Sequence, residues 1–399
     1  METRNVAFLS DDWYIDGETA WFLYSNVGAL LKYNFVTGKC EFVSIIPNEE
    51  NCSFRQYIKC IKTGDDIIVL PDYGHFILFY SLKKDCWAKV EIETSKKSRL
   101  ACWNYIKKGE KIYILSNGIK KVIELDIKEK KIMKYYDVSK ALDDYFGSVV
   151  MTSDSFYIVS SAYLTVYIFN CLSKEVSLFN IPTNLEDNFR TICYDNKLLW
   201  LSGRKKKIYK CNTETNQLDI FEEFPNDFGI YNFANKFDHI IECELERYDV
   251  PLFIESVKLD KKVWFIPFQT NKILFLDTVT NKLNEFVILD EEETETSLKN
   301  NILGHKYLVE YIRENRYIGL YSLKNEYMIE IDSDKLNYRI VPFDFDNSCI
   351  EIFENKIFTE VRKMDTIIYT EIIRDFQCNK MGKNEKIGSK IYFSINSSK

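Results

Sequence analysis

The sequence predicts an all-β fold: a single closed β-propeller of four-stranded antiparallel blades, with eight blades favoured and seven as the alternative. Two observations predict this fold. Short β-rich runs that end in Asn, Asp or Ser recur along the 399 residues, and a second hairpin precedes most of these runs. The polar ends of the runs, at positions 34, 81, 126, 170, 212, 277 and 332, are 42 to 65 residues apart. A four-strand unit repeated at this period is typical of propeller blades.

The runs are expected to be the third strand, c, of each unit. Their terminal Asn, Asp or Ser can accept a hydrogen bond from the backbone two residues on, which starts a turn. Four residues after this polar end, Gly38, Asp85, Asn216 and Asn281 occupy a position that favours left-handed backbone. The expected strands are 30–34, 77–81, 122–126, 167–170, 208–212, 273–277 and 328–332.

The second strand, b, follows a tight turn such as Thr63-Gly64-Asp65, and the fourth strand, d, often ends at a proline. Proline lacks an amide donor, so it is tolerated best at a sheet edge, where Pro47, Pro182, Pro225 and Pro342 are expected to lie. Residues 13–16 are the expected first strand, a, of the first unit. The expected b strands are 20–24, 67–70, 112–115, 156–159, 198–201, 263–266 and 317–320.

An eighth, less regular unit is expected near the C-terminus, with strands at 349–353, 356–362 and 366–372. Its fourth strand is either 390–395 or 5–9, and the second choice would close the ring by joining the two ends of the chain. The whole chain, 1–399, is expected to be one domain. Breaks in the period predict insertions near 226–251, 289–301 and 374–388.

Two segments carry a resemblance to a known repeat. Residues 212–225 (NTETNQLDIFEEFP) and 277–286 (DTVTNKLNEF) resemble the strand c to strand d half of kelch repeats, and 33–39 is similar. Propellers resembling virginiamycin B lyase share this spacing, so the resemblance implies the fold and no chemistry. The paired glycines expected after strand b of a kelch repeat are absent, since Leu70-Pro71 and Leu115-Ser116 stand there. No histidine matches the metal site expected of a virginiamycin B lyase.

Composition and charge exclude several classes of function. The 53 basic and 60 acidic residues give a net charge of −7 without a basic stripe, so nucleic acid is not an expected partner. No run approaches the roughly 18 apolar residues of a membrane span, and the first residues do not resemble a leader. The 11 cysteines lack a Cys-x-x-Cys pair, which favours reduced thiols and a cytoplasmic location. Three scattered histidines predict neither a metal site nor a cofactor.

Candidate ligand residues lie near the expected channel mouth, on the face shared by the d-to-a and b-to-c loops. Arg55, Arg99 and His305 precede three a-to-b turns by nine or ten residues, and Arg190 stands near another strand a. Converging guanidinium groups can bind a carboxylate or phosphate through two hydrogen bonds. Local pairing of each arginine with an acidic residue is the alternative.

The expected function is a non-catalytic platform for protein–protein or ligand binding, because the sequence shows charged and aromatic loops but no recognisable catalytic set. The expected partner is a protein or a small anionic or sugar-like ligand, and the chain is expected to be a monomer. The alternative is an enzyme that acts on a small anionic or sugar-like substrate at the channel mouth. In that case the arginines would hold the substrate and His305 would act as acid or base.

Overall fold

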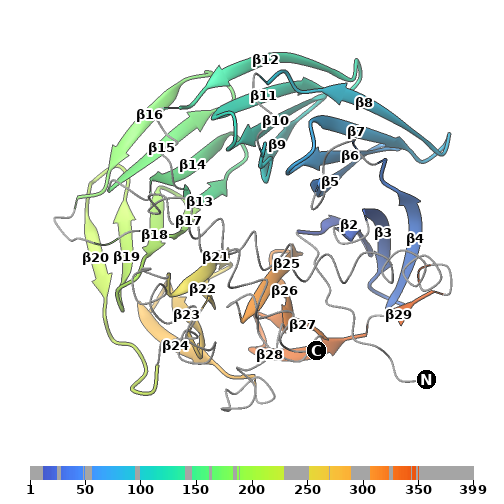
Figure 1. Cartoon of the computed structure of the whole chain (residues 1–399). Coiled ribbons are helices and arrows are strands. Elements are labelled where there is room, and N and C mark those ends of the chain that lie inside the picture. The colour runs from blue at the N-terminus through green and yellow to red at the C-terminus, as the bar shows by residue number, and fades with distance from the viewer. Residues whose placement is uncertain are drawn as a thin grey trace, which may run out of the picture. The chain divides into compact units, whose positions relative to one another are not determined.

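Seven four-stranded antiparallel sheets stand in a ring and form a β-propeller, as the sequence predicted (Figure 1). The chain divides into two compact units, Met1–Ile352 and Phe353–Lys399, and all described residues belong to the first. The extent of the predicted single domain therefore stays a prediction. The computed structural model describes residues 12–24, 28–47, 49, 56–94, 99–139, 146–160, 164–182, 187, 189–228, 251–268, 270–288, 306–322, 327–342, 344–346 and 349.

Each blade takes four consecutive strands, with the first strand nearest the centre of the ring (Figure 1). Blades 1 to 4 comprise β1 Tyr14–Asp16, β2 Thr19–Tyr24, β3 Ala29–Asn34, β4 Lys39–Ile45; β5 Tyr57–Thr63, β6 Asp66–Pro71, β7 Phe76–Ser81, β8 Cys86–Glu91; β9 Asn104–Lys108, β10 Lys111–Ser116, β11 Lys121–Asp126, β12 Lys131–Asp137; and β13 Phe146–Met151, β14 Ser155–Ser160, β15 Thr165–Asn170, β16 Val176–Asn180. Blades 5 to 7 comprise β17 Thr191–Asp195, β18 Leu198–Ser202, β19 Ile208–Asn212, β20 Leu218–Phe221; β21 Phe253–Leu259, β22 Lys262–Pro267, β23 Ile273–Asp277, β24 Lys282–Phe286; and β25 Tyr307–Arg313, β26 Tyr317–Ser322, β27 Tyr327–Asp332, β28 Asn337–Val341.

Blade 7 contacts blade 1 directly, so the described ring has seven blades, the alternative count, in place of the favoured eight. The backbone N–H of Trp13 donates to the carbonyl of Glu310 at 2.6 Å. The rings of Trp13 and Tyr311 lie 5.3 Å apart, and the Tyr33 hydroxyl donates to the Pro342 carbonyl at 2.7 Å. Apart from Cys349, the segments expected to form an eighth unit, and both candidate closing strands, lie outside the described residues.

A short fifth strand extends blade 1. Residues Asp344–Phe345 form β29, which pairs in parallel with Lys39 and Cys40 at the outer edge of β4. Most of the predicted insertion at 226–251, and all of those at 289–301 and 374–388, lie outside the described residues. Among the residues that the structure describes, no helix is long and apolar enough to cross a membrane.

The repeated turns follow the predicted side-chain chemistry. Oδ1 of Asn34 accepts the N–H groups of Val36 and Thr37, both at 2.9 Å. The same pair of bonds recurs at Asn170, Asn212, Asp277 and Asp332. The predicted left-handed residues have positive φ: Gly38 70°, Asp85 50°, Asn216 58° and Asn281 55°; so do Lys130 at 48°, Lys174 at 65° and Leu336 at 51°.

The core lies between the blades. Strands b and c are buried on both faces, and for this reason they read as nearly continuous apolar runs, such as Ile67 to Leu70. Apolar clusters join each blade to the next from blade 1 through blade 7. At the junction of blades 7 and 1, the Trp13 ring stacks on Phe22 at 4.4 Å and Phe35 meets Tyr311 edge-on at 5.1 Å.

Substituting Gly38 tests the junction of blades 7 and 1. A Cβ at Gly38 would lie 2.8 Å from Cγ of Pro342, whereas a Cβ at Gly17 would meet nothing within 4 Å. Both glycines have positive φ, so alanine costs about 1–2 kcal/mol at either position. We expect Gly38→Ala to reduce the free energy of unfolding by at least about 1 kcal/mol more than Gly17→Ala, measured by urea denaturation. Equal losses would show that Pro342 moves away from the added methyl group at no measurable cost, which contradicts the prediction.

Candidate functional site

Arg99 lies on the predicted face and is held by a buried carboxylate. Its Nε donates to Oδ1 of Asp72 at 2.7 Å and its Nη2 donates to Oδ2 at 3.0 Å. Asp72 is fully buried and also accepts the indole N–H of Trp103 at 3.1 Å. The guanidinium carbon lies 4.8 Å from the Tyr73 ring centroid and 4.9 Å from that of Trp103. An anion at Arg99 would therefore have to compete with Asp72.

The other predicted ligand residues are distributed around the ring or lie outside the described part of the chain. Arg190 directly precedes β17 of blade 5, and its backbone N–H donates to the Ser202 carbonyl at 2.9 Å. Arg99 precedes β9 of blade 3, so blades 3 and 4 lie between the two arginines along the chain. Arg55 and His305 lie outside the described residues. Convergence of the four residues on one ligand stays a prediction.

A cleft of about 570 Å³ lies between blades 7 and 1, on the face formed by the a-to-b and c-to-d turns. This face is opposite to the one on which the sequence predicted a ligand. Blade 1 contributes Ile15, Gly17, Glu18, Phe35 and Val36 to the lining, and blade 7 contributes Arg313, Glu314 and Arg339.

A buried glutamate organises the arginines of the cleft. Glu330 of β27 is 2% exposed and accepts two bonds from Arg313, at 2.7 and 2.9 Å. Arg339 Nε donates to it at 2.9 Å, and the Tyr311 hydroxyl donates at 3.0 Å. Burial opposes ionisation of Glu330, but the hydrogen bonds and charges of the two arginines outweigh it and hold its pKa below the usual value.

The two arginines differ in how they face the cleft. Arg313 is enclosed: its guanidinium carbon lies 4.9 Å from the Phe35 ring and 4.1 Å from the Tyr317 ring, and Nη1 donates to Glu314 at 2.6 Å. The Arg339 side chain is 53% exposed and therefore supplies the accessible positive charge. Val36, at 69% exposure, supplies an accessible apolar group.

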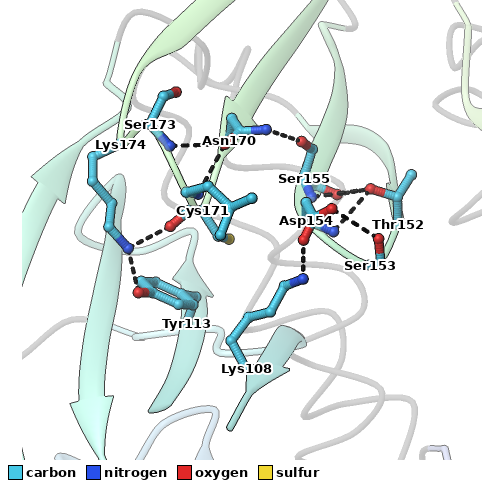
Figure 2. Close-up of polar contacts among 11 residues, drawn as sticks. Lys108, Tyr113, Thr152, Ser153, Asp154, Ser155, Asn170, Cys171, Ser173 and Lys174 are labelled. Carbon is cyan, nitrogen blue, oxygen red and sulfur yellow. Dashed lines mark hydrogen bonds and ion pairs between the residues drawn. The ribbon is translucent and has the colours of Figure 1, made fainter.

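An equivalent glutamate in blade 3 has a structural role. Glu124 stands two residues before Asp126, as Glu330 stands two before Asp332, and it accepts Lys111 and the Tyr136 hydroxyl, both at 2.5 Å. Lys174 of blade 4 lies 3.7 Å from it and also bonds the Tyr113 hydroxyl. Figure 2 shows the bond between Lys174 and Tyr113 beside a second contact, in which Lys108 of blade 3 bonds Asp154 of blade 4. These lysines tie blade 3 to blade 4.

Ionisable groups also meet at the inner strands of several blades. Lys59 of β5 bonds the carboxylate of Asp12, which precedes β1. Glu255 of β21 occupies the same position in blade 6 as Lys59 in blade 2, since each follows a bulge at the start of its strand. Burial raises the pKa of Glu255 to about 7, with a further increase from the charge of Asp12 that Lys59 opposes. Burial and Asp12 also raise the pKa of Tyr105 in blade 3.

Sequence reasoning did not identify Glu255, Lys59, Arg313 or Arg339, although part of the signal was present. Lys59 and Glu255 each follow an aromatic residue and an isoleucine at the start of a strand. A charge at that position of a buried strand is unusual and marks a possible site. Nothing local indicates the cleft, because its two halves are about 300 residues apart in the sequence.

Substituting Glu255 tests its raised pKa. An unfolded glutamate titrates near about 4.3. Because the folded state raises the pKa to about 7, it binds the proton more tightly, and stability falls as pH rises between these two values. We expect the unfolding free energy of the wild type, relative to Glu255→Gln, to fall by about 2–3 kcal/mol between pH 5 and pH 8, measured by urea denaturation. Glu91→Gln, at an exposed position of β8, is the control and should show no such trend.

Solved structures with the same fold share little sequence with this chain. A streptogramin B lyase structure matches with a TM-score of 0.53 and 13% identity, covering 81% of this chain and 92% of that one. The computationally designed Ika8 protein matches with a TM-score of 0.50 and 8% identity, covering 85% and 87%. A chain of a mitotic checkpoint complex matches with a TM-score of 0.51 and 9% identity, covering 80% and 87%.

No protein-family model and no curated protein matches the sequence. The lyase structure supports, at the level of the fold, the resemblance to virginiamycin B lyase-like propellers, whereas membership of the kelch family is not confirmed. At such low identities, the likeness establishes that the chain is a β-propeller and leaves its chemistry to be argued from its own residues.

Proposed function

We propose that this propeller is a non-catalytic binding platform, and that the cleft between blades 7 and 1 receives a peptide segment of a partner protein. The observation that carries the proposal is the lining of the cleft, where an exposed cation, exposed carboxylates and an exposed apolar group stand together. Its volume, about 570 Å³, is in the range of sites for drug-sized ligands.

The charges of the cleft favour a ligand of mixed charge. Arg313 and Arg339 stand against Glu18, Glu314 and the underlying Glu330, so the acidic groups outnumber the basic ones by one. This excess of negative charge would repel a simple anion. A peptide can give a carboxylate to Arg339, N–H donors or an ammonium to Glu18 and Glu314, and an apolar side chain to Val36.

The cleft is organised before a ligand arrives. Glu330 and two aromatic rings fix Arg313, and the closed ring of blades holds Phe35 opposite it. A site with fixed side chains loses little conformational entropy on binding, so even a short peptide can bind measurably.

A cytoplasmic location is part of the proposal, and the eight described cysteines are free thiols, as is typical of reducing compartments.

A thermal-shift panel of short peptides, sugar acids and neutral sugars at equal concentrations tests the proposal. We expect peptides that combine an acidic and an apolar residue to raise the Tm of the wild type, because binding to the native state stabilises it. Arg339→Gln should abolish the shift, while Lys83→Gln, at a 74% exposed lysine in another blade, should leave it unchanged.

Two results would contradict the assignment. A shift produced by sugar acids alone, and lost in Arg339→Gln, would replace the peptide with a small anionic ligand. Peptide shifts that persist in Arg339→Gln would remove the cleft as the site.

A second candidate function is an enzyme acting on a small anionic or sugar-like substrate at the channel mouth. Glu255 favours it, because a carboxyl group with a pKa of about 7 can both give and take a proton near neutral pH. The streptogramin B lyase structure is that of an enzyme, but its likeness to this chain extends to the fold alone. The roles predicted for Arg55, Arg99, Arg190 and His305 in such an enzyme remain predictions.

Turnover of a panel of sugar acids and other small anions, followed by mass spectrometry, tests the enzyme. If Glu255 is the acid or base, Glu255→Gln should lower kcat at least about 100-fold and remove a kinetic pKa near 7 from the rate profile. Glu91→Gln is the matched control. Turnover that Glu255→Gln leaves unchanged would exclude this role.

A further inference from the structure

The outer edge of blade 4 lacks the charges that protect the other outer strands. β16 has the sequence VSLFN, without a charged residue. The remaining outermost strands that the structure describes all carry charge: Lys39 and Glu41 in β4, Lys89 and Glu91 in β8, Lys131, Lys134 and Asp137 in β12, Asp219 in β20, Lys282 and Glu285 in β24, and Arg339 in β28. Charged side chains on sheet edges discourage pairing with another chain.

The register shows which backbone groups of β16 face outward. Asn170 N–H donates to the Glu175 carbonyl, and Ile181 N–H donates to the Leu164 carbonyl. Hydrogen-bonded pairs alternate along an antiparallel ladder, so residues 175, 177, 179 and 181 bond to β15. Val176, Leu178 and Asn180 therefore direct their N–H and C=O groups away from the sheet.

Two of these residues carry the exposed apolar side chains of the strand. Val176 is 40% exposed and Leu178 is 62% exposed. Within the described part of the chain, no strand pairs with this edge, whereas β29 covers the edge of β4. Unpaired backbone groups beside exposed apolar side chains form a template for an added strand.

We propose that two copies of this chain associate by antiparallel pairing of β16 with β16 across a two-fold axis at Leu178. In this register Leu178 lies opposite Leu178 of the other copy, and Val176 lies opposite Asn180. Each of these opposed pairs exchanges two backbone hydrogen bonds, which gives about six in total. The interface is isologous, so it closes at a dimer and does not propagate.

Charge opposes the self-pairing of two other edge strands but not that of β16. A two-fold axis places the central residue of an edge strand opposite its own copy. The central residue of β12 is Lys134 and that of β28 is Arg339, so self-pairing of either strand would oppose like charges. The central residue of β16 is Leu178, and its self-pairing brings apolar side chains together.

The size of the contact sets the expected affinity. A five-residue strand pair is smaller than standard protein–protein interfaces, which bury about 1,600 Å². The dimer is therefore weak and depends on concentration, with a Kd of the order of 10 µM or more. A monomer at all accessible concentrations is the competing outcome.

Sedimentation velocity of the full chain, from about 1 to 300 µM, tests the proposal. We expect a monomer–dimer equilibrium in the wild type that Leu178→Lys weakens at least about 10-fold. Ile340→Lys, at a 51% exposed position of β28, is the matched control and should leave the equilibrium unchanged. Thermal unfolding of both variants verifies that they are folded.

A cross-linking experiment gives a second readout. Cysteine at position 178 would lie opposite its own copy with Cα atoms about 5.5 Å apart, so a short bis-maleimide can join the two thiols. The cross-linker should therefore dimerise Leu178→Cys more than Ile340→Cys. The proposal is overturned by a wild type that stays monomeric, by a dimer that Leu178→Lys leaves intact, or by equal cross-linking of the two cysteine variants.

Discussion

The contact between blade 7 and blade 1 is the interaction on which the rest of the ring depends. All the other junctions of the ring join blades that are consecutive in the sequence. The contact between blades 7 and 1 joins residues about 300 positions apart. Trp13, Tyr33 and Phe35 of blade 1 meet Tyr311 and Pro342 of blade 7. If this junction opened, two blades would each expose an apolar face to water, and the cost would scale with that area.

The junction and the candidate cleft are two aspects of one structure. Glu330 fixes Arg313, and Arg313 packs on Phe35 across the junction, so the same side chains hold the ring closed and line the cleft. In blade 3 the equivalent Glu124 is met by lysines, one of them from blade 4. Blades 3 and 7 thus both use a buried glutamate of strand c at a contact with the next blade, and blade 7 adds an exposed arginine.

The sequence predicts what local chemistry determines and misses what distant segments create together. Asn34 and its equivalents were identifiable because a side-chain acceptor and its backbone donors lie within three residues. The number of blades was not identifiable in this way, because it depends on the contact between Trp13 and Glu310, which are far apart in the sequence. The eighth unit was inferred from runs of residues alone. Arg99 was placed on the expected face, but its buried partner Asp72 belongs to another loop and carries no local mark.

The seven c-to-d turns have one backbone shape but differ in how well their residues suit it. Gly38, Asn216 and Asn281 adopt positive φ at little cost, whereas Lys130 and Leu336 hold the same conformation against a penalty of about 1 kcal/mol. Comparison of the blades thus gives a consensus for this turn: Lys130 of blade 3 and Leu336 of blade 7 could be replaced by the Gly or Asn found in other blades. The chain is therefore less stable than its architecture permits. Once these turn residues are exchanged, the more stable chain could tolerate destabilising substitutions elsewhere.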